Sequence, residues 1–378
     1  MANDGRAGIL LHRNYLGDRS MTYFLKRHKV VHIWAAVLVL LFCFYQRVIS
    51  NTAAANAVAA ITQRLKDGYA ALWYLFPFSV VEWMYVAFIL IAIFWLVAVI
   101  LRIRKSREKW HTAYSGFLSL LCLCLSVWGF YCIFWGVNYY TDGFQEKSGI
   151  YAEKVSADEL ERVAVYFATE LAACAGDVAR DENGVFAVTR DEIFAYSPHV
   201  YDNISEEFEF LRNEDRVPKR MVFSRLFSAM NFTGFYTPFT GESNLNVDSP
   251  ACLCPANITH ELAHQRGIAS EQECNFLAIA AATSSDHPAY RYSGYLMGYI
   301  HLSNALYRAD PERWERLYAL LPGTVIADLR FHSAYWDQFE SPTATVSKKI
   351  YDATLKGYGQ TDGIQSYGTV VDLLVAYY

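Results

Sequence analysis

The sequence lacks several patterns that identify common classes of soluble protein. It has no internal repeat, no Gly-rich phosphate-binding loop and no Gly-x-Ser-x-Gly nucleophile motif. It also has no basic excess, since 33 Lys and Arg stand against 38 Asp and Glu, and this balance gives no sign of a nucleic-acid partner. No cleavage site of small residues closely follows a short apolar core near the N-terminus, so a removed signal peptide is not expected.

Three apolar runs near the N-terminus predict a multi-pass protein of the cell membrane. They cover residues 30–49, 79–101 and 116–137, approximately, and the last two are long enough to cross the hydrocarbon layer. Basic residues precede the first run and separate the second from the third, so positive-inside counting places the N-terminus in the cytoplasm. We therefore predict a membrane domain at 1–140, embedded in the lipid bilayer, and an extracytoplasmic domain at 141–378.

A His-Glu-x-x-His motif stands at residues 260–264. Residues four apart lie on one face of a helix, so His260 and His264 project in the same direction. Two imidazoles at this spacing suit one tetrahedral Zn2+, and Glu261 would lie beside the open position of the metal. A carboxylate there can take a proton from water that zinc has acidified. The motif therefore predicts two zinc ligands, His260 and His264, and a general base, Glu261.

A third ligand is expected soon after the motif, because catalytic zinc sites usually combine three protein ligands with a water molecule. A second helix is predicted from residue 270. There Ser270 and Glu273 fit a capping box, which would engage Glu273 with the backbone and leave Glu271 to face the metal. Glu271 is the predicted third ligand, and Asn275, one turn later, is a predicted hydrogen-bond partner of the ligands. Glu273 and then Cys274 are the alternatives.

The region after residue 140 has a mainly helical pattern with one short β element. Residues 231–246 mix strand-forming residues with Gly and Pro, which favours a short extended segment or hairpin. Helices are predicted at 156–179, 290–308, 311–321, 346–356 and 368–378. The amphipathic segment 56–74, between the first two apolar runs, has two interpretations: it lies along the membrane surface, or it packs beneath the outer domain.

The residues around the motif resemble those of known membrane metallopeptidases. Residues 271–275, Glu-Gln-Glu-Cys-Asn, resemble the Glu-x-x-Ala-Asp helix of HtpX-like and prenyl-protein peptidases, with Cys and Asn replacing Ala and Asp and a far shorter gap after the first motif. More closely, the blocks at 234–246, 260–267 and 355–374 resemble an uncharacterised bacterial family of multi-pass membrane proteins placed among the zincin-like peptidases. This resemblance implies three transmembrane helices followed by an α-rich, gluzincin-like domain with a zinc site. It implies no substrate.

Zincin-like peptidases have an edge strand along the cleft above the catalytic helix, and residues 234–242 are the segment that would take this part. A peptide substrate can add to such an edge through main-chain hydrogen bonds. Tyr236 is a predicted donor to the oxyanion that forms during attack, with a structural turn as the alternative explanation of this residue. Tyr295, His301 and Arg330 are further donors that the sequence does not rank.

Four of the eight cysteines lie in apolar runs and are expected to act as small hydrophobic residues. The others lie in the outer domain, where a disulfide is permissible: Cys174, Cys252, Cys254 and Cys274. Single histidines such as His287 and His332 are expected to be structural.

Together the patterns predict a membrane-anchored zinc metallopeptidase that acts on a peptide or protein substrate. His260, His264 and Glu271 would hold Zn2+, while Glu261 would take a proton from the attacking water and pass it to the leaving amine. Two alternatives are open: a catalytically silent membrane-anchored sensor or binding protein that retains the fold, and an amidase that acts on cell-envelope material. A fourth protein ligand that closes the site would favour the silent protein.

Overall fold

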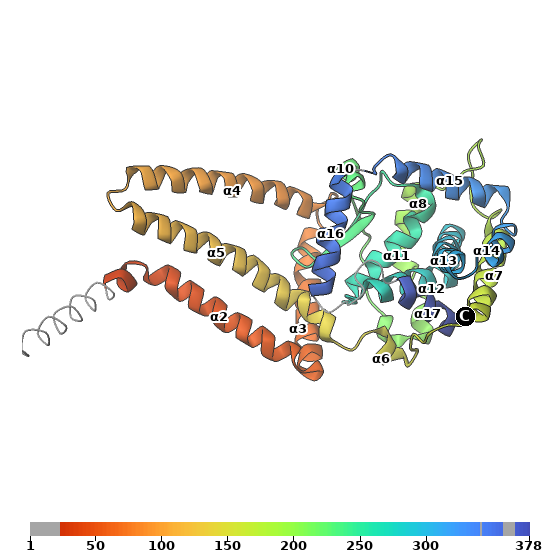
Figure 1. The fold of residues 1–378 in the computed structure, drawn as a ribbon, viewed down its shortest axis with the longest axis horizontal. Coiled ribbons are helices and arrows are strands. Elements are labelled where there is room, and N and C mark those ends of the chain that lie inside the picture. The colour runs from red at the N-terminus through yellow and green to blue at the C-terminus, as the bar shows by residue number, and fades with distance from the viewer. Residues whose placement is uncertain (1–22, 341, 358–366) are drawn as a thin grey trace, which may run out of the picture. The chain divides into compact units, whose positions relative to one another are not determined.

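The computed structural model describes residues 23–340, 342–357 and 367–378 and is mainly helical (Figure 1). Contacts within the chain divide it into two compact units. Unit 1 consists of the described residues up to 50 together with 86–133, and unit 2 consists of 51–85 together with the described residues from 134 onward. The sequence places one boundary at residue 140, whereas in the structure the segment 51–85 belongs with the C-terminal region.

Unit 1 is built from α2 (Lys29–Ile49) and from most of α4 (Val80–Lys105) and α5 (Lys109–Phe134). All three helices are long and apolar enough to cross a membrane, as predicted. Large apolar side chains on them are exposed, for example Phe94 at 75% and Leu40 at 69%, which supports membrane association. The connection between α4 and α5 is shorter than the sequence predicts. Both helices extend beyond their apolar runs into the basic residues 102–109.

Unit 2 begins with α3 (Thr52–Trp73), which is capped by the side chain of Asn51 and packs against the 3-10 helix η1 (Gly136–Tyr140). The segment predicted to be amphipathic is therefore part of the same unit as the motif. The other helices from residue 144 to residue 265 follow in chain order: α6 (Phe144–Ser148), α7 (Ala157–Cys174), α8 (Arg190–Tyr196), η2 (Ser197–His199), α9 (Ile204–Glu207), η3 (Glu209–Leu211), α10 (Ser224–Ala229), η4 (Ala251–Leu253) and α11 (Cys254–Gln265).

The C-terminal part of unit 2 is helical, as the sequence predicts. Its helices are α12 (Glu271–Ser284), α13 (Pro288–Ala309), α14 (Pro311–Tyr318), α15 (Gly323–Asp337), α16 (Pro342–Gly357) and α17 (Tyr367–Tyr377). The sequence does not predict α15, because it opens with Gly323 and Thr324 directly after Pro322, and these residues are typical of a turn.

The β element is a small sheet of β1 (Lys219–Arg220), β2 (Gly234–Thr237) and β3 (Glu242–Leu245), in the order β1-β3-β2. β1 is parallel to β3, and β2 is antiparallel to it. The predicted short hairpin is confirmed, since β2 and β3 pair from Gly234 with Leu245 to Thr237 with Glu242. Among the described residues β2 is an edge strand of this sheet.

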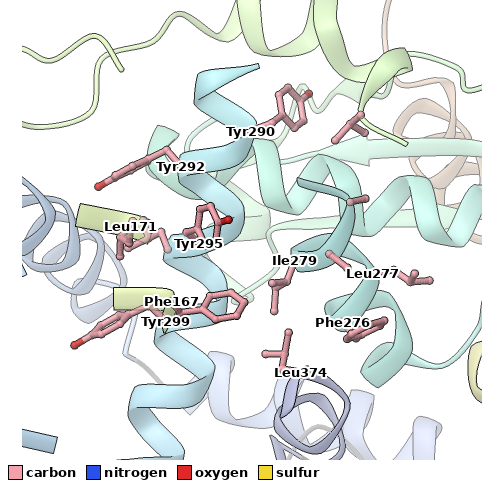
Figure 2. Packing of buried hydrophobic residues seen from close by; sticks show 14 of the residues in the cluster. Phe167, Leu171, Phe276, Leu277, Ile279, Tyr290, Tyr292, Tyr295, Tyr299 and Leu374 are labelled. Atoms are coloured by element: carbon pink, nitrogen blue, oxygen red, sulfur yellow. The ribbon is translucent and has the colours of Figure 1, made fainter. Parts of the chain in front are cut away.

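The core of unit 2 lies where α13 packs against α7, α12 and α17 (Figure 2). The two residues Phe167 of α7 and Ile279 of α12 are fully buried beside α13, and the backbone of Gly298 approaches Phe167 so closely that no side chain would fit between them. This packing fixes the direction of α12, and α12 in turn packs against α11, which carries the His-Glu-x-x-His motif.

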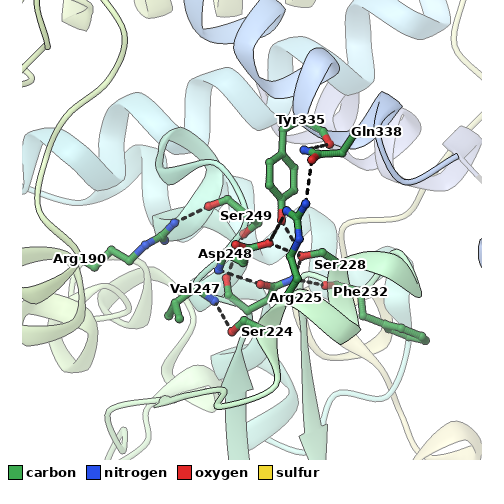
Figure 3. Close-up of polar contacts among 11 residues, drawn as sticks. Arg190, Ser224, Arg225, Ser228, Phe232, Val247, Asp248, Ser249, Tyr335 and Gln338 are labelled. Atoms are coloured by element: carbon green, nitrogen blue, oxygen red, sulfur yellow. Dashed lines mark hydrogen bonds and ion pairs between the residues drawn. The ribbon is translucent and has the colours of Figure 1, made fainter.

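A polar network holds the chain between β3 and α11 (Figure 3). Asp248 accepts hydrogen bonds from Tyr335 on α15 (2.6 Å) and from Arg225 on α10 (3.1 Å). Arg225 also donates to Gln338 (3.0 Å), and the backbone of Val247 donates to Ser224 (3.0 Å). The segment that leads into the His-Glu-x-x-His motif is therefore bound to both α10 and α15.

Two buried carboxylates join the start of α4 to the sheet within unit 2. Glu242 accepts hydrogen bonds from the backbone N–H groups of Val80 (3.3 Å) and Val81 (3.1 Å), which are free donors at a helix start. Glu82 accepts from the N–H groups of residues 222 and 223, at 2.8 Å each. Lys219 on β1 forms an ion pair with Glu242 and donates to the carbonyl groups of residues 73 (2.7 Å) and 78 (3.0 Å). The segment 73–82 is thus bound to β1, to residues 222 and 223, and to β3.

Candidate metal centre

Two consecutive helices place the predicted metal ligands. The imidazole rings of His260 and His264 on α11 have their centroids 4.9 Å apart. Gly267 ends this part of the chain with a φ of +83°, a left-handed conformation that favours glycine, and so permits a sharp reversal. Ser270 then caps α12 by accepting a hydrogen bond from the backbone of Glu273 (3.4 Å). The first residue of α12, Glu271, faces the two histidines as a result.

The three predicted ligands meet in one place. Glu271 lies 3.2 Å from Nε2 of His260 through one carboxylate oxygen and 3.6 Å from Nε2 of His264 through the other. One donor atom from each residue lies within 4.8 Å of the others, and no other such group of three is found among the described residues. We call these three residues the metal cluster. The side chain of Glu271 is 18% exposed, so the cluster is partly open to water.

Hydrogen bonds fix the orientation of both imidazoles. Nδ1 of His260 lies 2.9 Å from Oδ1 of Asn275, and Nδ1 of His264 lies 2.7 Å from the carbonyl oxygen of Ile268. Because both partners are acceptors, the Nδ1 atoms carry the protons and the Nε2 atoms keep their lone pairs. Neutral imidazoles held in this way are typical of metal ligands. Asn275 therefore has the contact that the sequence predicts.

Glu261 is buried next to the edge strand. A Cβ atom at Gly234 of β2 would lie 2.8 Å from Oε1 of Glu261, so only glycine leaves room for this carboxylate. The other oxygen, Oε2, has no hydrogen-bond partner among the described residues. Burial raises the pKa of Glu261 to about 8, the charge of His260 lowers it and the charge of Glu271 raises it. The side chain of Glu261 is thus buried, and one of its oxygens accepts no hydrogen bond from the described residues.

The electrostatics of the two histidines differ. Burial lowers the pKa of His264 to about 4, so the ring is neutral. Burial also acts to lower the pKa of His260, but its hydrogen bond to Glu271 and the charge of that carboxylate outweigh this and raise the pKa above its usual value.

The donor set fits a zinc ion. Two neutral imidazoles and one carboxylate are ligands that zinc accepts, and three protein ligands leave a position for water. The unpartnered oxygen of Glu261 is what a general base beside that position requires. A cation at the cluster would also favour the ionised form of Glu261, which burial alone disfavours.

The two alternative ligands do not face the cluster. The carboxylate of Glu273 accepts hydrogen bonds from the N–H groups of Phe144 (2.9 Å) and Gln145 (3.3 Å) at the start of α6. The expected return bond from Glu273 to its own helix cap is therefore wrong, because α6 offers unpaired donors nearby. The sulfur of Cys274 lies 3.3 Å from Nδ1 of His264, on the side of the ring away from Nε2.

The ring of Trp135 lies between Tyr236 and the cluster and contacts both. The ring centroid of Tyr236 is 5.0 Å from that of Trp135, and the ring of Trp135 meets that of His264 edge-on at 5.6 Å. Burial, with smaller contributions from neighbouring tyrosines and Asp67, raises the pKa of Tyr236 well above its usual value, so the hydroxyl keeps its proton. The role of Tyr236 as an oxyanion donor stays a prediction.

A buried lysine for which the sequence predicts no role lies next to these rings. Nζ of Lys66 on α3 is 5.0 Å from the ring centroid of Trp135 and 5.8 Å from that of Tyr236. The residue is 1% exposed, and its Nζ has no hydrogen-bond partner among the described residues. Burial lowers the pKa of Lys66 to about 7, although the charge of Asp67 opposes this. The burial of Lys66 could not be predicted from the sequence, because a lysine in an amphipathic helix is expected on the exposed face.

The structure separates the three donors that the sequence does not rank. His301 on α13 is 9% exposed, and burial, followed by the positive charge of His260, lowers its pKa to about 4, which places it near the cluster. Tyr295 instead packs against Phe167 in the core, and Arg330 is exposed. His301 is therefore the one of the three whose pKa is affected by a predicted metal ligand, His260.

The contacts of His287 and His332 agree with the structural roles expected for these two residues. His287 caps α13 by accepting a hydrogen bond from the backbone of Ala289 (3.2 Å), and His332 accepts one from Trp336 (3.0 Å). All eight cysteines are free thiols, so the disulfide considered for the four cysteines after residue 140 is not formed.

Comparison with known proteins gives one match. A family model described as "Protein of unknown function (DUF3810)" matches residues 60–375, which is well over half of the chain and includes α3, the sheet and the metal cluster. No curated protein and no solved structure matches the chain. The chain therefore belongs to the DUF3810 family of uncharacterised proteins.

Proposed function

We propose that the chain is a membrane-anchored zinc metallohydrolase of zincin type that cleaves peptide bonds. The observation that carries this proposal is the convergence of His260, His264 and Glu271 with an unpartnered, buried oxygen of Glu261 beside them. His260, His264 and Glu271 would hold the zinc ion. When bound, zinc lowers the pKa of water and polarises a carbonyl group.

The residues of the chain have separate parts in this reaction. Asn275 and the carbonyl of Ile268 hold the two imidazoles in the orientation that presents Nε2. Glu261 takes the proton of the attacking water and transfers it to the leaving amine. Ser243 of β3 donates a hydrogen bond to the carbonyl oxygen of Glu261 (3.0 Å) and so keeps α11 against the sheet.

The edge strand supports a peptide as the substrate. Among the described residues β2 pairs on one side only, and Gly234 brings its backbone next to the carboxylate of Glu261. An extended peptide that adds to the free edge of β2 would run past Glu261, with its main chain held by hydrogen bonds. We propose that the membrane helices anchor this site on the extracytoplasmic side, as the charge of the loops indicates.

The donor set also bears on the silent-protein alternative. A structural zinc site would be closed by a fourth protein ligand, whereas three donors converge here and Cys274 lies on the far side of His264. This arrangement supports a site with an open position for water and substrate.

The test uses the full chain, purified in detergent, with zinc measured by elemental analysis and cleavage followed on an unstructured peptide library by mass spectrometry. Wild type is expected to hold about one zinc ion per chain. Glu261→Gln should keep the zinc and lose about 10²- to 10⁴-fold in cleavage rate, because only the base is removed. Glu271→Ala should lose both. Folded wild type without zinc would overturn the proposal, and zinc without cleavage of any peptide would reject the peptidase part of it.

A further inference from the structure

A polar cavity lies in unit 1, near the basic residues 102–109 at the adjoining ends of α4 and α5. It has a volume of about 300 Å³, at the lower end of the range for small-ligand pockets. Its walls come from the residues before α2, from α4 and from α5, all within unit 1. We call it the basic cavity. Its charged and polar lining side chains are Arg27, His28, Arg102, His111, Thr112, Ser115 and Ser119.

The lining of the basic cavity carries positive charge without a carboxylate. Arg27 already forms an ion pair with Glu108, which lies outside the lining, and donates a hydrogen bond to Tyr23 (2.8 Å). The guanidinium of Arg102 has no hydrogen-bond or ion-pair partner among the described residues. A guanidinium is always charged and presents donors that match the oxygens of a phosphate. Arg102 is thus a cation without an anion.

Two histidines form another wall of the cavity. Nε2 of His28 lies 3.1 Å from Nδ1 of His111, and the two rings are stacked with centroids 5.4 Å apart. One ring must donate to the other, so the pair presents a further donor or a positive charge when it takes up a proton. His28 is 5% exposed and is held between helices, so this wall is rigid.

The remaining lining changes from polar to apolar along the helices. Thr112, Ser115 and Ser119 follow one another on one face of α5 at helical spacing. Trp95 and Val99 of α4 complete the lining on the apolar side. A ligand with an anionic head and an apolar remainder would match both ends. Basic pockets between transmembrane helices bind lipid headgroups in this manner.

We propose that the basic cavity binds a phosphate anion, carried by a phospholipid headgroup or free in solution, with Arg102 as its main cationic contact. The hydroxyl groups of Ser115 and Ser119 and the His28–His111 pair supply additional donors, whereas the hydroxyl of Thr112 already donates to Ser106 (2.8 Å). An anion at this place offsets the cost of holding the guanidinium and the histidines together at the membrane surface. This site is independent of the metal cluster and of the proposed hydrolysis.

The test measures binding to the full chain in neutral detergent by native mass spectrometry, with three probes: phosphatidylglycerol, a diacylglycerol with the same acyl chains, and inorganic phosphate. Wild type should bind phosphatidylglycerol about tenfold more tightly than diacylglycerol. If the source is free phosphate, inorganic phosphate should bind alone and phosphatidylglycerol should show no preference. The two forms of phosphate are thereby distinguished.

Two matched variants decide whether the cavity is responsible. Arg102→Gln should weaken the preferred phosphate probe about tenfold, since it removes a charge-assisted contact. Arg104→Gln removes the same charge from the same helix end, but residue 104 does not line the cavity, so binding should stay within about twofold of wild type. His111→Gln should give a smaller loss than Arg102→Gln. Equal loss in Arg102→Gln and Arg104→Gln, or equal binding of phosphatidylglycerol and diacylglycerol without phosphate binding, would overturn the proposal.

Discussion

Each of the two units contains a close pair of histidines, and the two pairs have opposite surroundings. In unit 2, His260 and His264 share the carboxylate of Glu271, and their Nδ1 atoms are bound to oxygen acceptors. In unit 1, His28 and His111 bind each other, and arginines line the same cavity. An imidazole is suited to either a cation or an anion, so its neighbours decide the kind of ligand. We propose that the first pair binds a metal ion and that the second contributes to a phosphate site.

The largest expected effect tests whether only the first pair of histidines binds metal. His264→Ala should reduce the zinc content from about one per chain to near zero, because two ligands bind zinc far more weakly than three. His111→Ala should leave the zinc content unchanged, since its partners include no carboxylate. Elemental analysis of both purified variants checks this. Zinc that is lost equally in both variants would show that the two pairs are alike.

The next effect concerns the hydrogen bonds that orient the first pair. Asn275→Ala removes the acceptor of Nδ1 of His260 and should weaken zinc binding about 10- to 100-fold. Asn275→Asp keeps an acceptor at that place and should retain or strengthen binding. Competition with a chelator of known affinity measures both. An unchanged affinity in Asn275→Ala would mean that the carboxylate of Glu271 alone orients the ring.

Lys66 provides a third case for this comparison. It is a buried basic residue, and the cavity beside it is too small for a ligand. Lys66→Met should stabilise the protein by about 1–3 kcal/mol near pH 6.5, since it removes an unpartnered ammonium from between two aromatic rings. Asp67 supplies the one acidic charge that raises the pKa of Lys66, and Glu214 and Arg216 line the small cavity beside it.

The sign of its pH dependence follows from the pKa. The pKa of Lys66 is about 7 in the folded protein and 10.5 in the unfolded chain. Between these values the unfolded chain binds more protons, so the stability of wild type rises with pH. The advantage of Lys66→Met should therefore be full below pH 7 and shrink toward about pH 10. Thermal unfolding at several pH values tests this, and an advantage that is constant with pH would contradict the buried charge.

The smallest expected effect separates the two neighbouring carboxylates of α12. Glu273→Gln keeps one oxygen acceptor for the start of α6, so it should lower the free energy of unfolding by only about 0.5–1.5 kcal/mol. Its zinc content should equal that of wild type, whereas Glu271→Gln should lose zinc. A loss of zinc in Glu273→Gln would move the third ligand by two residues.

Local patterns predicted which residues converge in the candidate metal centre, but little of what surrounds them. The positions of His260, His264 and Glu271 follow from helical spacing and from a break between two helices, which are properties of neighbouring residues. The contact of Lys66 with Trp135 joins residues 69 positions apart, and those of Glu242 with the start of α4 join residues 161 and 162 positions apart; no periodicity indicates such pairs. The prediction that Glu273 binds its own helix cap was wrong for the same reason. The N–H groups at the start of α6 are distant in sequence, and they bind this carboxylate instead.

The division of the chain into units was also beyond local patterns. Apolar runs mark α2, α4 and α5 clearly, since length and composition suffice to recognise a helix that can cross a membrane. Whether the connection between α2 and α4 belongs to one unit or the other depends on its partners. Gln63 of α3 donates a hydrogen bond to the carbonyl of Gln265 at the end of α11 (2.8 Å), and this contact is invisible in either segment alone.

The attachment of the segment 73–82 to the sheet has a consequence for synthesis on the ribosome. This segment emerges before the two later long helices, yet the acceptors that it offers to Lys219 are used only when β1 has been made. Unit 2 therefore finishes folding late, after both of those helices have been translated. A fragment that starts at residue 134 would leave Lys219 without these carbonyl groups and the end of α11 without Gln63, so any shortened version for biochemical work has to retain residues 51–85.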